Sequence, residues 1–148
     1  MTSEAFINDY LSSDHKRLDL LLDNLSKAIE QSKGEDYIRS VFKLFQRGML
    51  RHMHWEESVL FPIFDEQVTK NHVSTDILKA EHKELATMLE ELEDSIEEGM
   101  SLEYVRGLEQ FVYTHHLREE EILYPVIDAM TKGDVQERMA IAFSQEFQ

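Results

Sequence analysis

The sequence contains no cysteine, which excludes disulfides, thiolate catalysis and cysteine-ligated metal or iron–sulfur sites. Basic residues are half as frequent as acidic ones, 15 against 30, and the net charge is −15. Nucleic acids and anionic membrane surfaces both bind cationic faces, so we expect neither as a partner. An apolar run of about 18 residues is also missing, which argues against a membrane span. Because four carboxylates interrupt the first twenty residues, we expect no signal peptide and a cytoplasmic protein.

Glycine and proline are scarce, with five and two residues in a chain of 148. Apolar residues recur at helical spacing almost throughout, which predicts an all-α protein. Polar or glycine-containing breaks at 33–34, 66–74, 98–99 and 132–133 separate four long segments. Long helices joined by short connections predict an up-down-up-down four-helix bundle.

The length of the chain predicts one domain, residues 1–148, with its core at about 5–130. Residues 2–12 are expected to form a short leading turn or helix. Ser101 is the expected N-cap of the fourth long helix. Asp134 and Glu137 resemble a capping box, which predicts a short C-terminal helix at 134–146.

Each proline closes one copy of a repeated segment. The stretches HMHWEESVLFP (52–62) and HHLREEEILYP (115–125) share His, Glu-Glu, Leu and Pro at matching places. DHKRL (14–18) precedes the first copy and EHKEL (81–85) precedes the second. An internal repeat of this kind predicts two helical hairpins of one design. Each hairpin carries one histidine followed by His-x-x-x-Glu.

The positions of the breaks predict that the repeated histidines meet. Residues equally distant from the connection of an antiparallel helix pair lie at the same height. The midpoint between His15 and His52 falls on the first glycine break, and the midpoint between His82 and His115 falls on the second. All four histidines should therefore lie at one level of the bundle, and each continues an inward apolar stripe.

Glu56 and Glu119 lie four residues after a histidine, about 40° further around the helix, and so face the same core. A buried carboxylate without a partner costs several kcal/mol, and two of them require something cationic. A lone histidine on an apolar face is usually a hydrogen-bonded core residue, but the repeated spacing argues for a pair of metal ions. The predicted metal ligands are His15, His52, Glu56, His82, His115 and Glu119.

Iron is the metal that this donor set favours, because carboxylates bridging two metals are typical of redox-active iron or manganese. The Glu-x-x-His motif of ferritin-like proteins does not occur. Without metal, we expect Glu56 or Glu119 to be neutralised by proton uptake.

The remaining polar residues of the repeat are expected at the surface, and Trp55 is expected to fill core beside the site. This group comprises His54, His72, His116, Glu57, Glu120 and Glu121. One of the three glutamates could accept a hydrogen bond from a metal ligand.

Together the four motifs resemble the hemerythrin-like, or HHE cation-binding, domain over about residues 5–130. The resemblance implies a non-haem di-iron centre with an oxo or hydroxo bridge. By this resemblance His15 and His52 would hold one iron, His82 and His115 the other, and the two glutamates would bridge. Respiratory members bind dioxygen reversibly, and relatives are linked to oxygen sensing, nitric oxide, peroxide and repair of iron–sulfur centres.

The chain departs from the respiratory pattern. Leu78 and Ala86 stand where those proteins carry a further histidine, and Glu119 follows its histidine at four residues where they have an aspartate at five. The cysteine-containing segment of repair proteins is absent. A nearly symmetric centre with open positions on both irons is therefore expected.

The functional prediction is binding of a small-molecule ligand or oxidant, dioxygen or nitric oxide, as a sensor, scavenger or store. The alternative is a redox enzyme that consumes peroxide, reduces nitric oxide or repairs iron centres. The open positions favour it, although the sequence shows no proton-delivering residue in the core and assigns no catalytic residue. An acidic helical interaction module without metal is the remaining alternative.

Overall fold

The computed structural model describes residues 6–67, 75–130 and 133–144, and throughout these ranges the regular structure is helical. The elements in chain order are α1 (Phe6–Glu30), α2 (Glu35–Trp55), η1 (Glu56–Leu60), α3 (Phe61–Gln67), α4 (Asp76–Asp94), α5 (Leu102–Arg118), η2 (Glu119–Leu123), α6 (Tyr124–Met130) and α7 (Gly133–Ser144).

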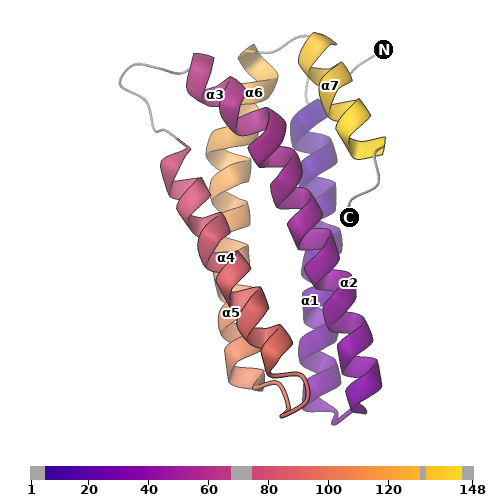
Figure 1. The fold of residues 1–148 in the computed structure, drawn as a ribbon. Coiled ribbons are helices and arrows are strands. Elements are labelled where there is room, and N and C mark those ends of the chain that lie inside the picture. The colour runs from indigo at the N-terminus through magenta and orange to yellow at the C-terminus, as the bar shows by residue number, and fades with distance from the viewer. Residues whose placement is uncertain (1–5, 68–74, 131–132, 145–148) are drawn as a thin grey trace.

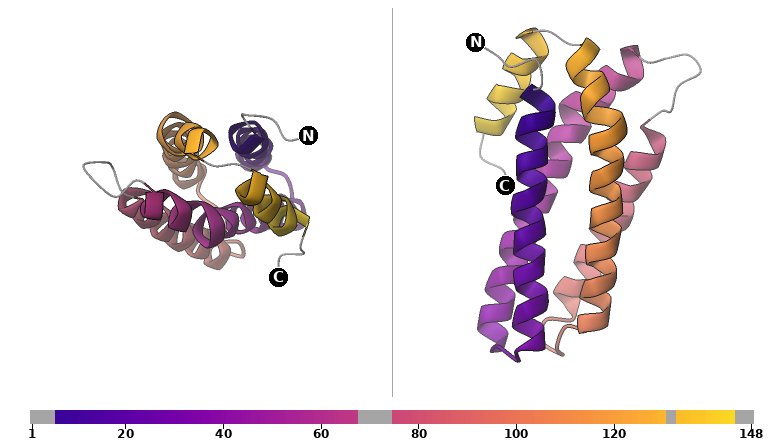
Figure 2. Two further views of the ribbon diagram at one scale, coloured as in Figure 1. Left: turned by 90° about the horizontal axis from the view of Figure 1, so that it is seen from above. Right: turned by 180° about the vertical axis from the view of Figure 1, so that it is seen from behind.

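Four long rods form the bundle (Figure 1). One rod runs through α2, η1 and α3 and another through α5, η2 and α6, while α1 and α4 are the other two. Seen from above, the rods surround a common axis, and the short helix α7 lies against one end of the bundle (Figure 2). The predicted all-α four-helix bundle with a short C-terminal helix is confirmed. No described helix is both long enough and apolar enough to cross a bilayer.

The helix boundaries agree with the predicted breaks. α1 ends and α2 begins on either side of 33–34, and α4 and α5 on either side of 98–99. Ser101 is the N-cap of α5, since its hydroxyl accepts a hydrogen bond from the backbone N–H of Tyr104 at 3.2 Å. The break at 66–74 lies largely outside the described residues.

The separate leading element predicted at 2–12 was wrong. From Phe6 onward the chain is already part of α1, because Ile7 and Leu11 are fully buried and extend the apolar stripe of that helix. The carboxylate of Asp128 accepts hydrogen bonds from the backbone N–H groups of Ile7 and Asn8, both at 2.9 Å. It therefore satisfies donors that the first turn of a helix leaves free.

Two π-helical segments interrupt the second and fourth rods at equivalent places. Each begins at the glutamate of a His-x-x-x-Glu motif and ends two residues before a proline. The backbone N–H of Phe61 donates to Glu56 O, and that of Tyr124 donates to Glu119 O, five residues back in each case. A proline ring clashes with the carbonyl four residues earlier in an α-helix, and a widened turn relieves that clash. The rods therefore continue past both prolines.

The apolar core is divided into two clusters. One holds residues such as Leu18, Phe45 and Leu108 toward the α1–α2 and α4–α5 connections. The other holds residues such as Ile7 and Phe61 toward the opposite end. The motif histidines and glutamates occupy the level between them, so apolar side chains keep water away on both sides.

Trp55 belongs to the second cluster and is 3% exposed. Its indole Nε1–H donates to the carbonyl of Ala142 at 3.2 Å, which attaches α7 to α2. Its ring centroid lies 6.2 Å from that of His52. Trp55 therefore fills core beside the site and also holds the C-terminal helix.

Two helix glycines provide a test of this packing. A Cβ on Gly48 would lie 2.8 Å from Leu18 Cδ2, whereas a Cβ on Gly107 would meet nothing within 4 Å. Gly107→Ala should raise the free energy of unfolding by about 0.5–1 kcal/mol, because alanine loses less backbone entropy in a helix. Gly48→Ala should gain less than this or destabilise the protein. Urea denaturation of both variants measures the difference, and equal gains would show that α1 and α2 are less closely packed at Gly48.

Candidate metal centre

The six predicted ligands converge in the structure at one level of the bundle. Their donor atoms form two groups of four, and within each group the atoms lie within 4.8 Å of one another. All six side chains are at most 3% exposed. Both groups contain Glu56 and Glu119, so these two carboxylates are shared between them. The groups are His15, His52, Glu56 and Glu119, and Glu56, His82, His115 and Glu119.

Unpaired buried atoms in the second group test whether a metal fits there. Glu56 Oε1, Glu119 Oε2 and the Nε2 atoms of His82 and His115 are buried and have no hydrogen-bond partner. Yet His82 Nε2 lies 3.1 Å from Glu56 Oε1, and His115 Nε2 lies 3.1 Å from Glu119 Oε2. Buried polar atoms are rarely left unpaired, because each costs about 1–3 kcal/mol. Nitrogen and oxygen donors facing one another in this way fit a transition-metal ion.

Within each hairpin, a carboxylate outside the donor groups holds one ligand imidazole. His52 Nδ1 lies 2.7 Å from Asp14 Oδ2, and His115 Nδ1 lies 2.9 Å from Glu81 Oε1. A carboxylate on Nδ1 fixes the ring so that Nε2 points at the centre. Sequence reasoning missed both acids. The signal that could have found them is the acidic residue immediately before the first histidine of each copy, in DHK and EHK.

A second pair of carboxylates lies close to imidazoles of the opposite hairpin. His15 Nδ1 lies 2.7 Å from Glu120 Oε2, and His82 Nδ1 lies 3.6 Å from Glu57 Oε1. Each of these glutamates directly follows a shared carboxylate, Glu119 or Glu56, and the two are part-exposed, at 36% and 48%. The expectation that one of these acids supports a ligand therefore holds for Glu120, whereas the contact of Glu57 is longer than a hydrogen bond.

Tyr124 was missed as a member of the site. Its fully buried hydroxyl lies 2.5 Å from Glu56 Oε2 and 3.2 Å from Glu119 Oε1. It also lies 2.9 Å from the Nε2 atom of His15 and 3.1 Å from that of His52. These are the four donors of the first group, so the hydroxyl belongs to that group alone.

The π-helical turn explains why sequence reasoning overlooked Tyr124. In an α-helix, a residue five places after Glu119 would lie about 140° away around the axis. In η2 the hydrogen bond also spans five residues, which brings Tyr124 over Glu119. The equivalent residue of the first copy is Phe61, whose ring centroid lies 5.1 Å from that of His82. The two halves of the centre therefore differ by one hydroxyl.

The prediction that His116 lies at the surface was wrong. Its side chain is 3% exposed and stacks on His15, with ring centroids 3.6 Å apart and an interplanar angle of 7°. The reason is that α1 packs over this face of α5. Burial lowers the pKa of His116 to about 4, so the ring is neutral near pH 7. His54 is exposed as predicted, and His72 lies outside the described residues.

The charges of the metal-free centre differ from expectation. Burial lowers the pKa of His52, but Glu56 and Asp14 outweigh it and raise that pKa to about 10. Burial likewise lowers the pKa of His82, and its carboxylate neighbours raise it to about 11. For Glu56 and Glu119, burial raises the carboxyl pKa, but the surrounding imidazoles lower it below the ordinary value. Protons taken up in place of metal therefore reside on imidazoles rather than on the glutamates.

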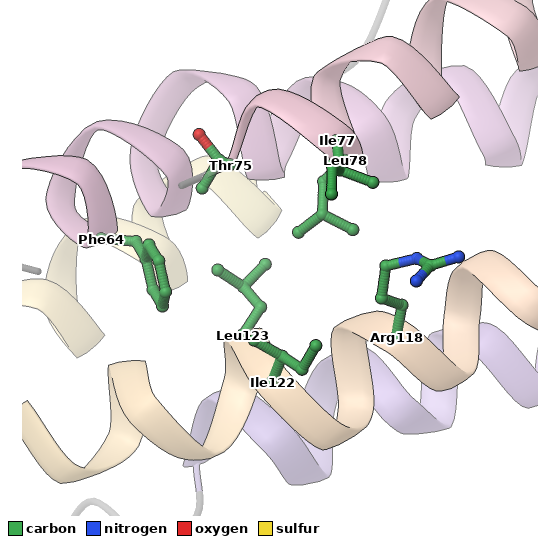
Figure 3. Close-up of a pocket in the computed structure, with 7 residues that line it drawn as sticks. All are labelled: Phe64, Thr75, Ile77, Leu78, Arg118, Ile122 and Leu123. Atoms are coloured by element: carbon green, nitrogen blue, oxygen red, sulfur yellow. The ribbon is translucent and has the colours of Figure 1, made fainter. Parts of the chain in front are cut away.

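A small apolar hollow with an accessible volume of about 10 Å³, partly open to solvent, lies between α3, α4, α5 and η2 (Figure 3). Leu78, four residues before His82 on α4, faces into it across from Leu123, the residue before Tyr124. The hollow thus begins one helical turn from a predicted ligand, and its accessible space is about that of one water molecule. Its lining residues are Phe64, Thr75, Ile77, Leu78, Arg118, Ile122 and Leu123.

A helical bundle with buried histidine and glutamate donors shared between two positions defines a metal-binding protein. The family model of the hemerythrin HHE cation-binding domain matches residues 7–127 and, a second time, residues 73–142. The chain therefore belongs to the hemerythrin HHE cation-binding domain family, as the resemblance predicted. Comparison with curated proteins and with solved structures found no match.

The raised imidazole pKa values predict how pH affects the metal-free protein. A histidine whose pKa in the folded protein lies above its ordinary value of 6.5 stabilises the fold. This stabilisation is complete below pH 6.5. This stabilisation is lost as pH rises through the folded values of about 10 for His52 and about 11 for His82. With a chelator present, the melting temperature should fall by at least about 5 °C between pH 7 and pH 10.

The metal-loaded protein provides the internal comparison for this measurement. Metal competes with protons for the same imidazoles, so loading should become more favourable as pH rises. The stabilisation by metal, taken as the difference between the two melting temperatures, should therefore increase toward pH 10. A metal-free melting temperature that stays constant or rises over this range would contradict the assignment of protons to the imidazoles.

The outer carboxylates can be tested with a matched pair on one helix. Glu81 contacts His115 Nδ1 and also accepts a hydrogen bond from Arg118, whereas Glu84 is exposed three residues further along α4. Glu81→Ala should lower metal affinity by about 10–100-fold, because the ligand ring loses the acceptor that orients it. Glu84→Ala should leave the affinity unchanged. Competition with a chromophoric chelator measures both, and equal affinities would show that the Nδ1 contact does not support the ligand.

Proposed function

We propose that this chain holds a non-haem di-iron centre and binds a small ligand or oxidant, dioxygen or nitric oxide, as a sensor, scavenger or store. The observation that carries the proposal is the pair of donor groups sharing two fully buried carboxylates. His15 and His52 would hold one iron, His82 and His115 the other, and Glu56 and Glu119 would bridge them. Two such irons, when bound, supply positions at which a diatomic molecule can be held.

Iron is supported by the kinds of donor and by their sharing. Each group offers two imidazole nitrogens and two carboxylate oxygens and contains no thiolate. A structural zinc site would ordinarily be a single closed tetrahedron, whereas these two groups have common members. Carboxylates shared between metals are the arrangement used by paired redox-active iron or manganese.

The apolar hollow supports a small uncharged ligand. Leu78 lies 5% exposed on the face of α4 that carries His82, so no further side-chain donor reaches the centre from that turn. The hollow that Leu78 lines offers almost no polar surface. Its accessible volume of about 10 Å³ leaves no room for a sugar or another large ligand.

A redox enzyme at the same centre is the second candidate function. Sequence reasoning found no proton-delivering residue in the core, and that objection no longer holds because Tyr124 places a hydroxyl among the donors. Continuous consumption of hydrogen peroxide or nitric oxide by the iron-loaded protein would favour this candidate. Stoichiometric binding without turnover would favour the binding function.

Metal content tests the proposal directly. After anaerobic reconstitution with ferrous iron, about two irons per chain are expected, one for each donor group. Glu56 is fully buried and bridging, whereas its neighbour Glu57 is 48% exposed. Glu56→Ala should therefore lose about half of the iron or more, and Glu57→Ala should lose much less. Elemental analysis with circular dichroism as a folding control measures both variants.

The same measurement of metal content can also contradict the proposal. A folded wild-type protein holding less than about half an equivalent of any metal would overturn the di-iron proposal and favour a metal-free interaction module. Equal iron losses from the two variants would show that the inward face has been assigned to the wrong glutamate.

A further inference from the structure

We propose that Tyr124 is a fifth protein ligand of the iron held by His15 and His52, and that external ligands are thereby directed to the iron held by His82 and His115. This inference rests on the proposed di-iron function and goes beyond it by assigning different roles to the two metal positions. The centre is then asymmetric, contrary to the near symmetry expected from the repeated histidines.

The position of the phenol oxygen carries the first part of the proposal. Two donors at right angles on one metal lie about 3 Å apart when each bond is about 2.1 Å long. Tyr124 Oη lies 2.5 Å from Glu56 Oε2, 2.9 Å from His15 Nε2, 3.1 Å from His52 Nε2 and 3.2 Å from Glu119 Oε1. One oxygen is therefore at the spacing of adjacent ligands from all four donors of the first group.

The second group has no such oxygen. His82 Nε2, His115 Nε2, Glu56 Oε1 and Glu119 Oε2 have no hydrogen-bond partner, and the residue equivalent to Tyr124 is Phe61. Since each group otherwise offers two imidazoles and the same two carboxylates, this one hydroxyl distinguishes the two positions. The Tyr124 side chain is fully buried and already lies among these donors, so its oxygen needs no conformational change to reach a metal.

Counting donors gives the second part of the proposal. The first iron would have two imidazoles, two carboxylate oxygens and the phenol oxygen, five in all. The second would have two imidazoles and two carboxylate oxygens, four in all. With about six positions on each iron and one shared bridge, the first is filled and the second keeps one open. Leu78, which precedes His82 by one turn, lines the apolar hollow.

Coordination requires the phenol to lose its proton. The O–H bond breaks, the oxygen electron pair forms the bond to iron, and the proton leaves to solvent, as for other acidic groups that bind metal. No electron is transferred in this step. Tyr124 in this role is a ligand rather than a source of protons for turnover.

A ferric ion bound to a phenolate absorbs visible light by charge transfer from the oxygen to the metal, and this gives a readout separate from activity. Wild-type protein loaded with ferrous iron under anaerobic conditions and then exposed to air should develop such a band. Resonance Raman excitation in the band should enhance phenolate ring vibrations. Tyr124→Phe should lose both signals while retaining most of its iron.

Tyr37→Phe is the matched control, because it makes the same chemical change at a residue 52% exposed near the start of α2. It should retain both the band and the iron. Azide titration then counts open positions: one azide per two irons is expected for wild type and two for Tyr124→Phe, in which the first iron has lost a ligand.

The outcomes separate the two proposals. A wild-type protein with two irons but no visible band or phenolate vibration overturns the tyrosine ligand, leaves the di-iron function standing and returns Tyr124 to the role of proton donor. A band that persists in Tyr124→Phe, or equal azide stoichiometry in the two proteins, also overturns it. A protein without bound iron overturns both proposals. The spectra of wild type decide the question even if the variant fails to fold.

Discussion

The structure depends on the burial of two carboxylates among four imidazoles. Glu56 and Glu119 are fully excluded from solvent, each within 3.5 Å of the imidazole nitrogens around it. Without a cation, imidazoles must carry the compensating positive charge, and several buried donor atoms still remain unpaired. A metal ion bound among these donors would therefore stabilise the fold. Apolar clusters above and below this layer keep water away from these side chains.

The internal repeat also supplies the carboxylates that orient the imidazoles of this layer. In each hairpin the acid before the first histidine holds the ring of the second, as Asp14 holds His52. The acid after the bridging glutamate reaches across to the other hairpin, as Glu120 reaches His15. One set of contacts is thus internal to a hairpin and the other joins the two. His15 is therefore held by its outer carboxylate only when both hairpins are packed, which couples assembly of the bundle to assembly of the site.

The same duplication also allows the two halves to diverge. The prolines of both copies force a π-helical turn that begins at the bridging glutamate. This turn brings the residue five places later into the core, where one copy has Phe61 and the other Tyr124. A single hydroxyl then distinguishes two positions whose other donors match. In metal sites, the number of open positions on each ion decides where an external ligand binds.

The sequence by itself determined the all-α bundle and the six converging side chains, because helical periodicity and equal distances from the connections fix height and face together. The family followed from the same motifs. Only the tertiary structure decided what surrounds those side chains. Asp14 and Glu81 act on partners in other helices, and His116 is covered by α1, which the pattern along one helix does not reveal. Tyr124 required a change in helical pitch, because a rule of 3.6 residues per turn places it about 140° around the helix from Glu119.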